Sequence, residues 1–131
     1  MSEESKRILV VDDEPDSIEF VRVVLEEEGY EVVAANSADE GLAAIETEEP
    51  ELVILDVQMP GKDGFHAFSE IRRSPDFAEL PVIMLTGITD KTGIKFDGEL
   101  MGDYMGSEPE DFLDKPVDPV KLVASVKTAL S

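Results

Sequence analysis

The stretch ILVVDDEPDS, residues 8–17, joins a short apolar run to two adjacent acids. The run Ile8 to Val11 has no polar alternation, which is typical of a parallel strand covered on both faces. Asp12 and Asp13 follow it directly. Because ligands of open α/β sheets bind beyond the carboxyl ends of the strands, the acid pair stands where a site is expected.

The same pattern recurs along the chain. Further apolar runs cover residues 32–35, 52–55 and 82–85, and a weaker candidate covers residues 111–113. Segments of helical period lie between them, and the predicted helices cover residues 17–28, a stretch that begins at Ser37, residues 64–73 and a stretch that begins at Asp118. A further helix is expected between the fourth and fifth apolar runs. This alternation predicts an α/β domain with a parallel sheet and right-handed crossovers.

Capping residues indicate where several of these helices begin and end. Ser37 and Glu40 have the spacing of a capping box. Asp118 is a candidate N-cap before Pro119, which suits the first helical position. Gly29 is a candidate stop for the first helix.

The composition limits the class of protein. The chain has 131 residues and no cysteine, so we expect one domain over residues 1–131 without disulfides or thiolate metal sites. Residues 1–6 are expected to form an N-terminal tail, and no output domain is expected. Neither a signal peptide nor a membrane-spanning run is recognisable, which favours a cytoplasmic protein.

The charge is strongly one-sided. There are 31 acidic residues against 11 Lys and Arg, for a formal net charge of -20. This charge argues against direct binding to nucleic acid or to an anionic membrane, and it favours basic partners or bound cations. Most of the acids are expected on solvated helix faces.

The residues that follow the other apolar runs suggest one shared site. Asp56, Thr86 and Lys115 follow the third, fourth and fifth runs. Three converging carboxylates repel one another unless one takes a proton or a cation holds them, and Mg²⁺ prefers oxygen ligands. A carboxylate at such a metal can act as a nucleophile toward phosphorus, with Lys115 and Thr86 contacting the other phosphoryl oxygens.

Four motifs together resemble response regulator receiver domains, the phosphoacceptor modules of two-component signalling. They are VVDDEP (10–15), LDVQMPGKDG (55–64), MLTG (84–87) and FLDKP (112–116). The resemblance covers almost the whole chain. It implies a flavodoxin-like, doubly wound sheet of five parallel strands in the order 2-1-3-4-5, with helices on both faces.

The resemblance also implies roles for single residues. Asp56 matches the phosphorylated aspartate, and Asp13 a direct metal ligand. Asp12 matches an acid that acts through water. The remaining matches are Gln58, through its backbone carbonyl on the metal; Thr86, the switch hydroxyl; Phe112, the aromatic switch; and Lys115, the phosphoryl-contacting lysine. The implied metal is Mg²⁺, with Mn²⁺ as the alternative.

The implied partners follow from this chemistry. The donor is a sensor histidine kinase or a phosphotransfer protein, and the receiver of the signal is a downstream target protein. No turnover enzyme is implied, because such a domain catalyses only its own phosphorylation and slow autodephosphorylation. The chemotaxis-like and relay roles both remain open.

Three other functions are weighed against this one. An aspartyl-nucleophile phosphatase of the haloacid-dehalogenase type needs a second Asp two residues after the first, where this chain has Gln58. A flavodoxin-like flavin carrier needs a phosphate-binding loop after the first strand, and DDEPDS has the wrong charge. A degenerate receiver that acts only as a protein-binding module is disfavoured by the complete set of site residues.

One segment departs from the family pattern. The stretch between Thr86 and Lys115 is longer than usual and holds five of the nine glycines. Because glycine weakens a helix by about 1 kcal/mol relative to Ala, a regular helix there should be short, displaced or partly melted. We hypothesise that residues 88–108 become ordered on phosphorylation or partner docking. Ile88 cannot orient water, which predicts a long-lived phosphoryl group.

Overall fold

The computed structural model describes residues 6–57, 64–86, 111–114 and 117–130. Its sheet has five parallel strands in the order β2-β1-β3-β4-β5. The strands are β1 (Arg7–Val11), β2 (Glu31–Ala35), β3 (Leu52–Asp56), β4 (Val82–Thr86) and β5 (Asp111–Asp114). The described helices are α1 (Pro15–Glu27), α2 (Ala38–Glu48), α3 (Gly64–Arg73) and α6 (Pro119–Leu130).

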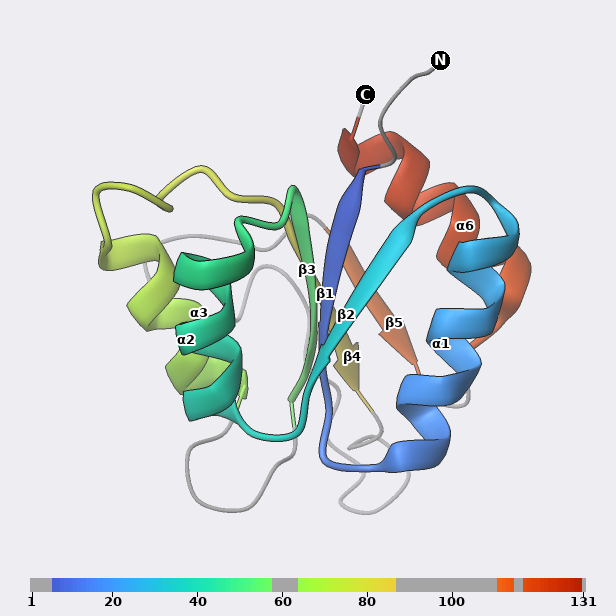
Figure 1. Ribbon diagram of the computed structural model, residues 1–131, viewed down its shortest axis with the longest axis horizontal. Coiled ribbons are helices and arrows are strands. Elements are labelled where there is room, and N and C mark those ends of the chain that lie inside the picture. Colours follow the sequence, from blue (N-terminus) through green and yellow to red (C-terminus); the bar gives the residue numbers. More distant parts are fainter. Residues whose placement is uncertain (1–5, 58–63, 87–110, 115–116, 131) are drawn as a thin grey trace.

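The helices cover both faces of the sheet. Helices α1 and α6 lie on one face, and α2 and α3 lie on the other (Figure 1). The carboxyl ends of the strands point toward the lower edge of the molecule in that view. The predicted fold class and strand order are therefore confirmed.

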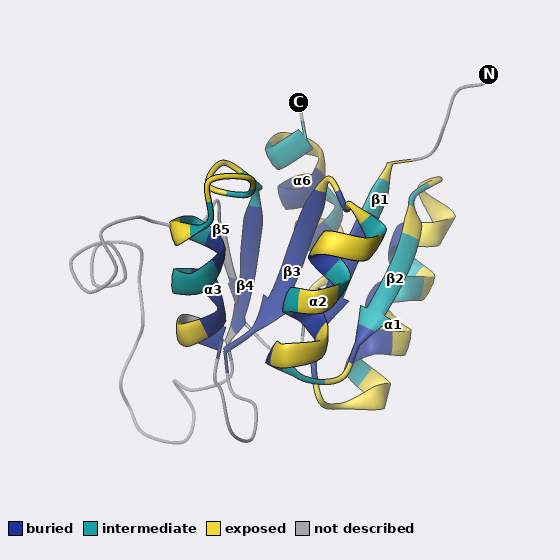
Figure 2. Ribbon diagram, turned by 60° about the vertical axis from the view of Figure 1, so that its left-hand side comes forward, coloured by how far each residue is buried: buried dark blue, intermediate teal, exposed yellow. Residues whose placement is uncertain are grey.

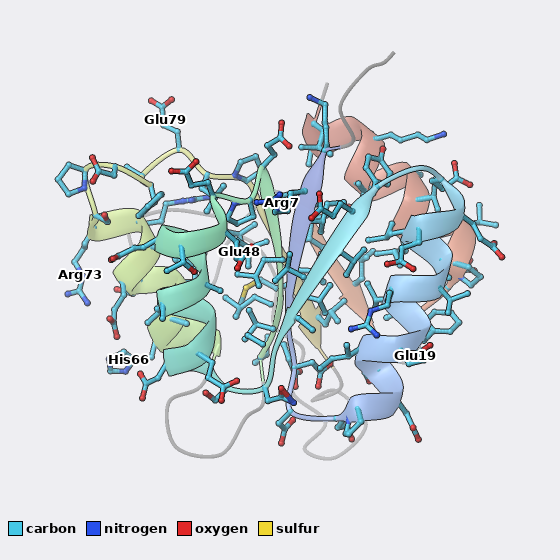
Figure 3. The ribbon with its side chains drawn as sticks, in the orientation of Figure 1. Arg7, Glu19, Glu48, His66, Arg73 and Glu79 are labelled. Atoms are coloured by element: carbon cyan, nitrogen blue, oxygen red, sulfur yellow. The ribbon has the colours of Figure 1, made fainter. Side chains whose placement is uncertain are left out.

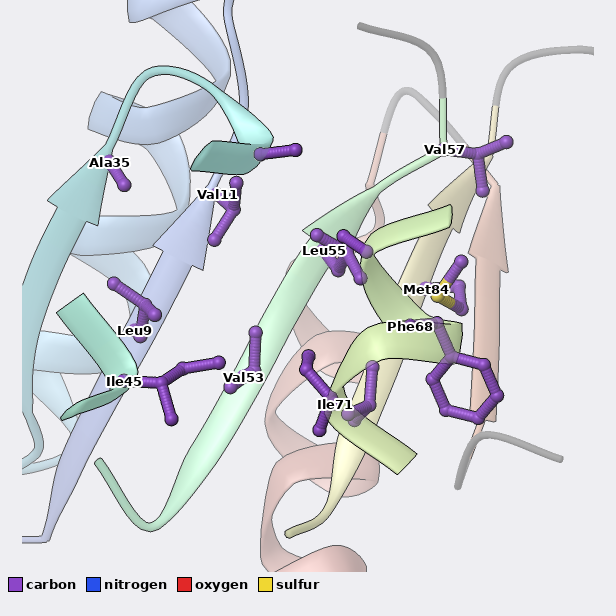
Figure 4. Packing of buried hydrophobic residues seen from close by; sticks show 13 residues of the cluster. Leu9, Val11, Ala35, Ile45, Val53, Leu55, Val57, Phe68, Ile71 and Met84 are labelled. Atoms are coloured by element: carbon purple, nitrogen blue, oxygen red, sulfur yellow. The ribbon is translucent and has the colours of Figure 1, made fainter. Parts of the chain in front are cut away.

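The alternation of side chains along each strand divides the core into two layers. Ile8 and Val10 of β1 pack in the layer under α1 and α6. Leu9 and Val11 point the other way, into the layer under α2 and α3 that Figure 4 shows. Strand β3 is the central strand of the sheet, so every one of its residues is buried. Strand β2 lies at the edge and buries only Ala35 (Figure 2).

The predicted helix ends agree with the structure. The Ser37 hydroxyl accepts a hydrogen bond from the Glu40 N–H at 3.1 Å. The Glu40 carboxylate reaches back to accept from the Asn36 N–H at 3.0 Å, one residue before the position that the motif predicts. Asp118 accepts from the Val120 N–H at 2.8 Å, and Gly29 has a φ of 93° just after α1.

Some boundaries differ from the predictions by one or two residues. Helix α1 begins at Pro15 instead of residue 17, because proline suits the first helical turn, where no intrahelical donor is needed. Strands β3 and β4 extend to Asp56 and Thr86, which were predicted to follow them. The ladder continues because the Val57 N–H still donates to the Leu85 carbonyl at 2.9 Å.

Arg7 makes polar contacts with several residues at the amino end of the sheet. The Arg7 guanidinium donates to the Glu48 carbonyl at 2.7 Å and lies 3.2 Å from a Glu31 carboxylate oxygen. Figure 3 shows Arg7 and Glu48 close together at the end of the sheet opposite the strand carboxyl ends. The Arg7 N–H also donates to the Glu51 carboxylate at 2.9 Å. Part of the large negative charge is thus balanced locally, and not only by solvent.

Among the residues that the structure describes, no helix is both long and apolar enough to span a bilayer.

The close packing of α2 on β1 supplies a test of the fold. A Cβ added at Gly41 would lie 2.7 Å from Cγ2 of Val11, a stiff β-branched side chain. We expect Gly41→Ala to destabilise the chain by about 1–3 kcal/mol through overpacking. In the Val11→Ala background the same change should instead stabilise by up to about 1 kcal/mol, the usual helical gain over glycine.

The test is a double-mutant cycle, in which urea unfolding is measured for the native chain, both single variants and the double variant. An effect of Gly41→Ala that is the same in both backgrounds would contradict the proposed contact.

Candidate metal centre

Asp12 stands one residue beyond β1 and is completely buried. Its N–H donates to the Ala35 carbonyl at 3.1 Å, which extends the β1–β2 ladder past Val11. Its Oδ1 accepts a hydrogen bond from the Glu14 N–H at 2.9 Å, just before α1 begins. These two bonds hold the Asp12 carboxylate at the carboxyl edge of the sheet.

Asp56 is the last residue of β3 and is 2% exposed. The β1–β3 register pairs Val11 with Leu55, so the residues that follow this pair, Asp12 and Asp56, are next to each other across the two strands. On its other side β3 pairs Asp56 with Leu85 of β4. The pairing of three adjacent strands therefore determines where the Asp56 carboxylate can lie.

Asp12, Asp13 and Asp56 form one cluster. Each offers a carboxylate oxygen, and these oxygens all lie within 4.8 Å of one another. Asp13 is the most exposed of the three, so the cluster is buried on the Asp12 and Asp56 side and reaches solvent at Asp13. Two buried charges at 4.8 Å repel by roughly 3 kcal/mol at an effective dielectric constant of about 20. A divalent cation between them would replace this repulsion with attraction.

The donor set fits a hard cation. Opposite oxygens around octahedral Mg²⁺ lie about 4 Å apart, since each bond is about 2.1 Å long. At most one pair of the three carboxylate oxygens could be opposite, and all three lie within 4.8 Å of one another, near enough to share one ion. Oxygen ligands on a cluster that is partly open to solvent also leave room for water, which Mg²⁺ retains.

Two of the other predicted site residues lie in the described strands, and two lie outside the described residues. Thr86 ends β4, where its backbone pairs with Asp114 of β5. Phe112 lies within β5, and its backbone pairs with Met84. Gln58 and Lys115 lie outside the described residues, as do residues 88–108 and therefore the hypothesis about their ordering.

His66, the single histidine of the chain, has a solvated position. It lies on α3 with 61% of its side chain exposed, 3.6 Å from the Glu70 carboxylate. Figure 3 shows it on the outer side of the helix.

The sequence did not predict the close packing at one residue near the site. Gly64 matched only a loop motif, yet a Cβ there would meet the backbone of Asp56 and Val57. A glycine eight residues after an aspartate carries no such signal by itself, because close approach depends on how α3 docks.

Removal of one carboxylate tests the electrostatics of the cluster. Asp12→Asn keeps an oxygen that can accept from the Glu14 N–H but removes a buried negative charge. We expect the metal-free variant to be more stable than the native chain by about 1–3 kcal/mol. Conversely, Mg²⁺ at 100 times its Kd should stabilise the native chain by about 2.7 kcal/mol and the variant far less.

Urea unfolding with Mg²⁺ and with a chelator measures both effects. Asp76→Asn, at an exposed acid beyond α3, is the matched control and should respond to Mg²⁺ as the native chain does. An equal magnesium response in Asp12→Asn would contradict the cluster as a cation site.

Comparison with known proteins identifies the family. The model of the response regulator receiver domain matches residues 8–127. Protein PilH of Pseudomonas aeruginosa is 31% identical over 125 residues, which cover 95% of this chain and 98% of PilH. The alkaline phosphatase synthesis transcriptional regulatory protein PhoP of Bacillus subtilis is 35% identical, and the match spans 96% of this chain but 49% of PhoP.

Solved structures agree with this result. Chemotaxis protein CheY4 of Vibrio cholerae superposes with a TM-score of 0.81 at 28% identity, covering 96% of this chain and 99% of CheY4. A CheY-like receiver domain protein of Methanospirillum hungatei gives a TM-score of 0.80 at 31% identity, covering 96% and 94%. With its sheet order and its acidic pocket of Asp12, Asp13 and Asp56, the chain belongs to the response regulator receiver family of two-component signalling.

Proposed function

We propose that this chain is a phosphoacceptor that takes a phosphoryl group onto Asp56 in a magnesium-dependent reaction. The observation that carries the proposal is the buried Asp56 carboxylate within 4.8 Å of the Asp12 and Asp13 carboxylates. The donor is the phosphohistidine of a sensor histidine kinase or a phosphotransfer protein. Membership of the receiver family supports this donor class.

The acid pair and Asp56 would hold the cation, together with the Gln58 carbonyl. When bound, Mg²⁺, or Mn²⁺ in its place, supplies positive charge that neutralises the carboxylates and the transferring phosphoryl group. Asp13 would be a direct ligand of the ion and Asp12 would act through water, the roles that membership of the receiver family supports. Asp12 also anchors the turn into α1 through the Glu14 N–H.

The reaction is a transfer between two nucleophiles. A carboxylate oxygen of Asp56 forms a bond to phosphorus while the bond between phosphorus and the imidazole nitrogen of the donor breaks. The imidazole leaves with the electron pair and takes a proton from solvent, and an acyl phosphate remains on Asp56. The Thr86 hydroxyl donates to one phosphoryl oxygen, and the Lys115 ammonium pairs with another as a compact point charge.

The output is a change of conformation at the carboxyl edge of β4 and β5. The phosphoryl group adds about 1.5 to 2 negative charges at neutral pH. Thr86 turns toward this charge, and Phe112 fills the space that Thr86 leaves. The altered surface then binds a downstream protein. The net charge of -20 supports a protein as the target, instead of nucleic acid bound directly.

Two alternatives predict different chemistry. A degenerate receiver would bind partners without any covalent change at Asp56. A phosphatase would release phosphate from a substrate in many turnovers, which the absence of a second Asp at position 58 disfavours.

Intact mass after incubation with acetyl phosphate and Mg²⁺ tests the proposal. The native chain should gain one phosphoryl group, and Asp56→Asn should gain none because its amide is not a nucleophile. Asp76→Asn, the same substitution at an exposed acid, should be phosphorylated like the native chain. A native mass that never changes would favour the degenerate receiver, and steady phosphate release would favour the phosphatase.

Hydrogen exchange tests the switch. We expect phosphorylation to slow exchange in residues 88–108 of the native chain, since a docked segment is protected. In Thr86→Ala the phosphoryl group should still form, but the change in exchange should be lost. Equal protection of residues 88–108 in both states of the native chain would argue against a switch in this segment.

A further inference from the structure

The connection from β3 to α3 closes tightly on the backbone of Asp56. The Val57 N–H donates to the Leu85 carbonyl of β4, and the Val57 carbonyl accepts from the Gly64 N–H, both at 2.9 Å. Val57, the residue that follows Asp56, is therefore held through its N–H by the sheet and through its carbonyl by the first residue of α3. This hydrogen bond from Gly64 spans the loop that separates the two elements.

The approach at this point leaves no room for a side chain. A Cβ at Gly64 would collide with the Asp56 carbonyl oxygen and lie 2.8 Å from the Val57 Cα. Both neighbours are backbone atoms, which cannot rotate away as the end of a flexible side chain can. Helix α3 cannot easily retreat either, because Ala67, Phe68 and Ile71 are buried in the core layer on that face (Figure 4).

We infer that Gly64 is a positioning residue for Asp56, because its bare Cα lets α3 clamp the end of β3 at the place where the Asp56 carboxylate meets Asp12 and Asp13. The inference rests on the proposed function. An added methyl group would push the Asp56–Val57 peptide away from the helix. The Asp56 oxygen would then move relative to the acid pair, within a cluster whose oxygens already span up to 4.8 Å. Magnesium demands near-ideal geometry, so binding should respond to a small displacement.

The test compares two Gly→Ala variants of the full chain. Gly64→Ala carries the clash. Gly29→Ala is the matched control, because its φ of 93° makes any side chain strained while the space around it is open. Gly29 lies between α1 and β2, at the end of the sheet away from the acid cluster (Figure 1). Both substitutions should lower the urea concentration at the midpoint of unfolding.

Three measurements separate positioning from stability. Calorimetry should show Mg²⁺ binding weakened by about 10- to 100-fold in Gly64→Ala, a range typical for loss of a group that orients a metal ligand. The phosphorylation rate with saturating acetyl phosphate and Mg²⁺ should fall by about 100-fold, as expected for a displacement near 1 Å. In the metal-free chain, the amide resonance of Val57 should shift. Gly29→Ala should leave all three at native values.

Each contrary result has a definite meaning. Native Mg²⁺ affinity and a native rate in Gly64→Ala would overturn the inference, as would equal losses in Gly29→Ala, which would assign them to stability. If Gly64→Ala does not fold in buffer, trimethylamine N-oxide stabilises the compact state, and all chains are compared there. Magnesium uptake by the native chain without phosphorylation would overturn only the proposed function, whereas absence of uptake would overturn both.

Discussion

The register of β1 against β3 is the constraint on which the site depends. Val11 pairs with Leu55, so each strand brings an acid to the same level of the carboxyl edge one residue later. A slip of one residue would separate the acids and would also turn Leu9 and Val11 toward the wrong layer of the core. The register that places alternate side chains in the two core layers therefore also aligns the carboxylates. Packing and chemistry are coupled through a single pairing.

The cluster opposes folding, and the rest of the domain offsets it. Asp12 and Asp56 are buried close together, which is unfavourable for two carboxylates without a cation. The opposing contribution comes from two apolar layers on a central strand with no exposed residue. At the other end of the sheet, Arg7 interacts with acids from β2, from α2 and from the residue before β3. Arg7 thus balances acids at one end of the sheet, and the acid cluster with its candidate cation site lies at the other end.

Helix packing close to the strands completes the geometry. Gly41 brings α2 onto Val11, directly before Asp12, and Gly64 brings α3 onto the backbone of Asp56. Both buried acids therefore lie next to a point where a helix approaches the sheet without a Cβ. In this chain, small residues beside the two buried acids therefore allow both helices to pack close to the strands that carry those acids.

Local patterns in the sequence determined most of the architecture. Apolar runs located β1 to β5, and Ser37, Asp118 and Gly29 marked helix ends, because capping and burial patterns act within a few residues. The acids that directly follow the apolar runs indicated Asp12, Asp13 and Asp56 as site residues. Only the tertiary structure decided that their oxygens lie within 4.8 Å, that Asp12 is buried while Asp13 reaches solvent, and that Gly64 touches the Asp56 backbone. These facts depend on strand register and helix docking, which join residues far apart in the chain and leave no local signal.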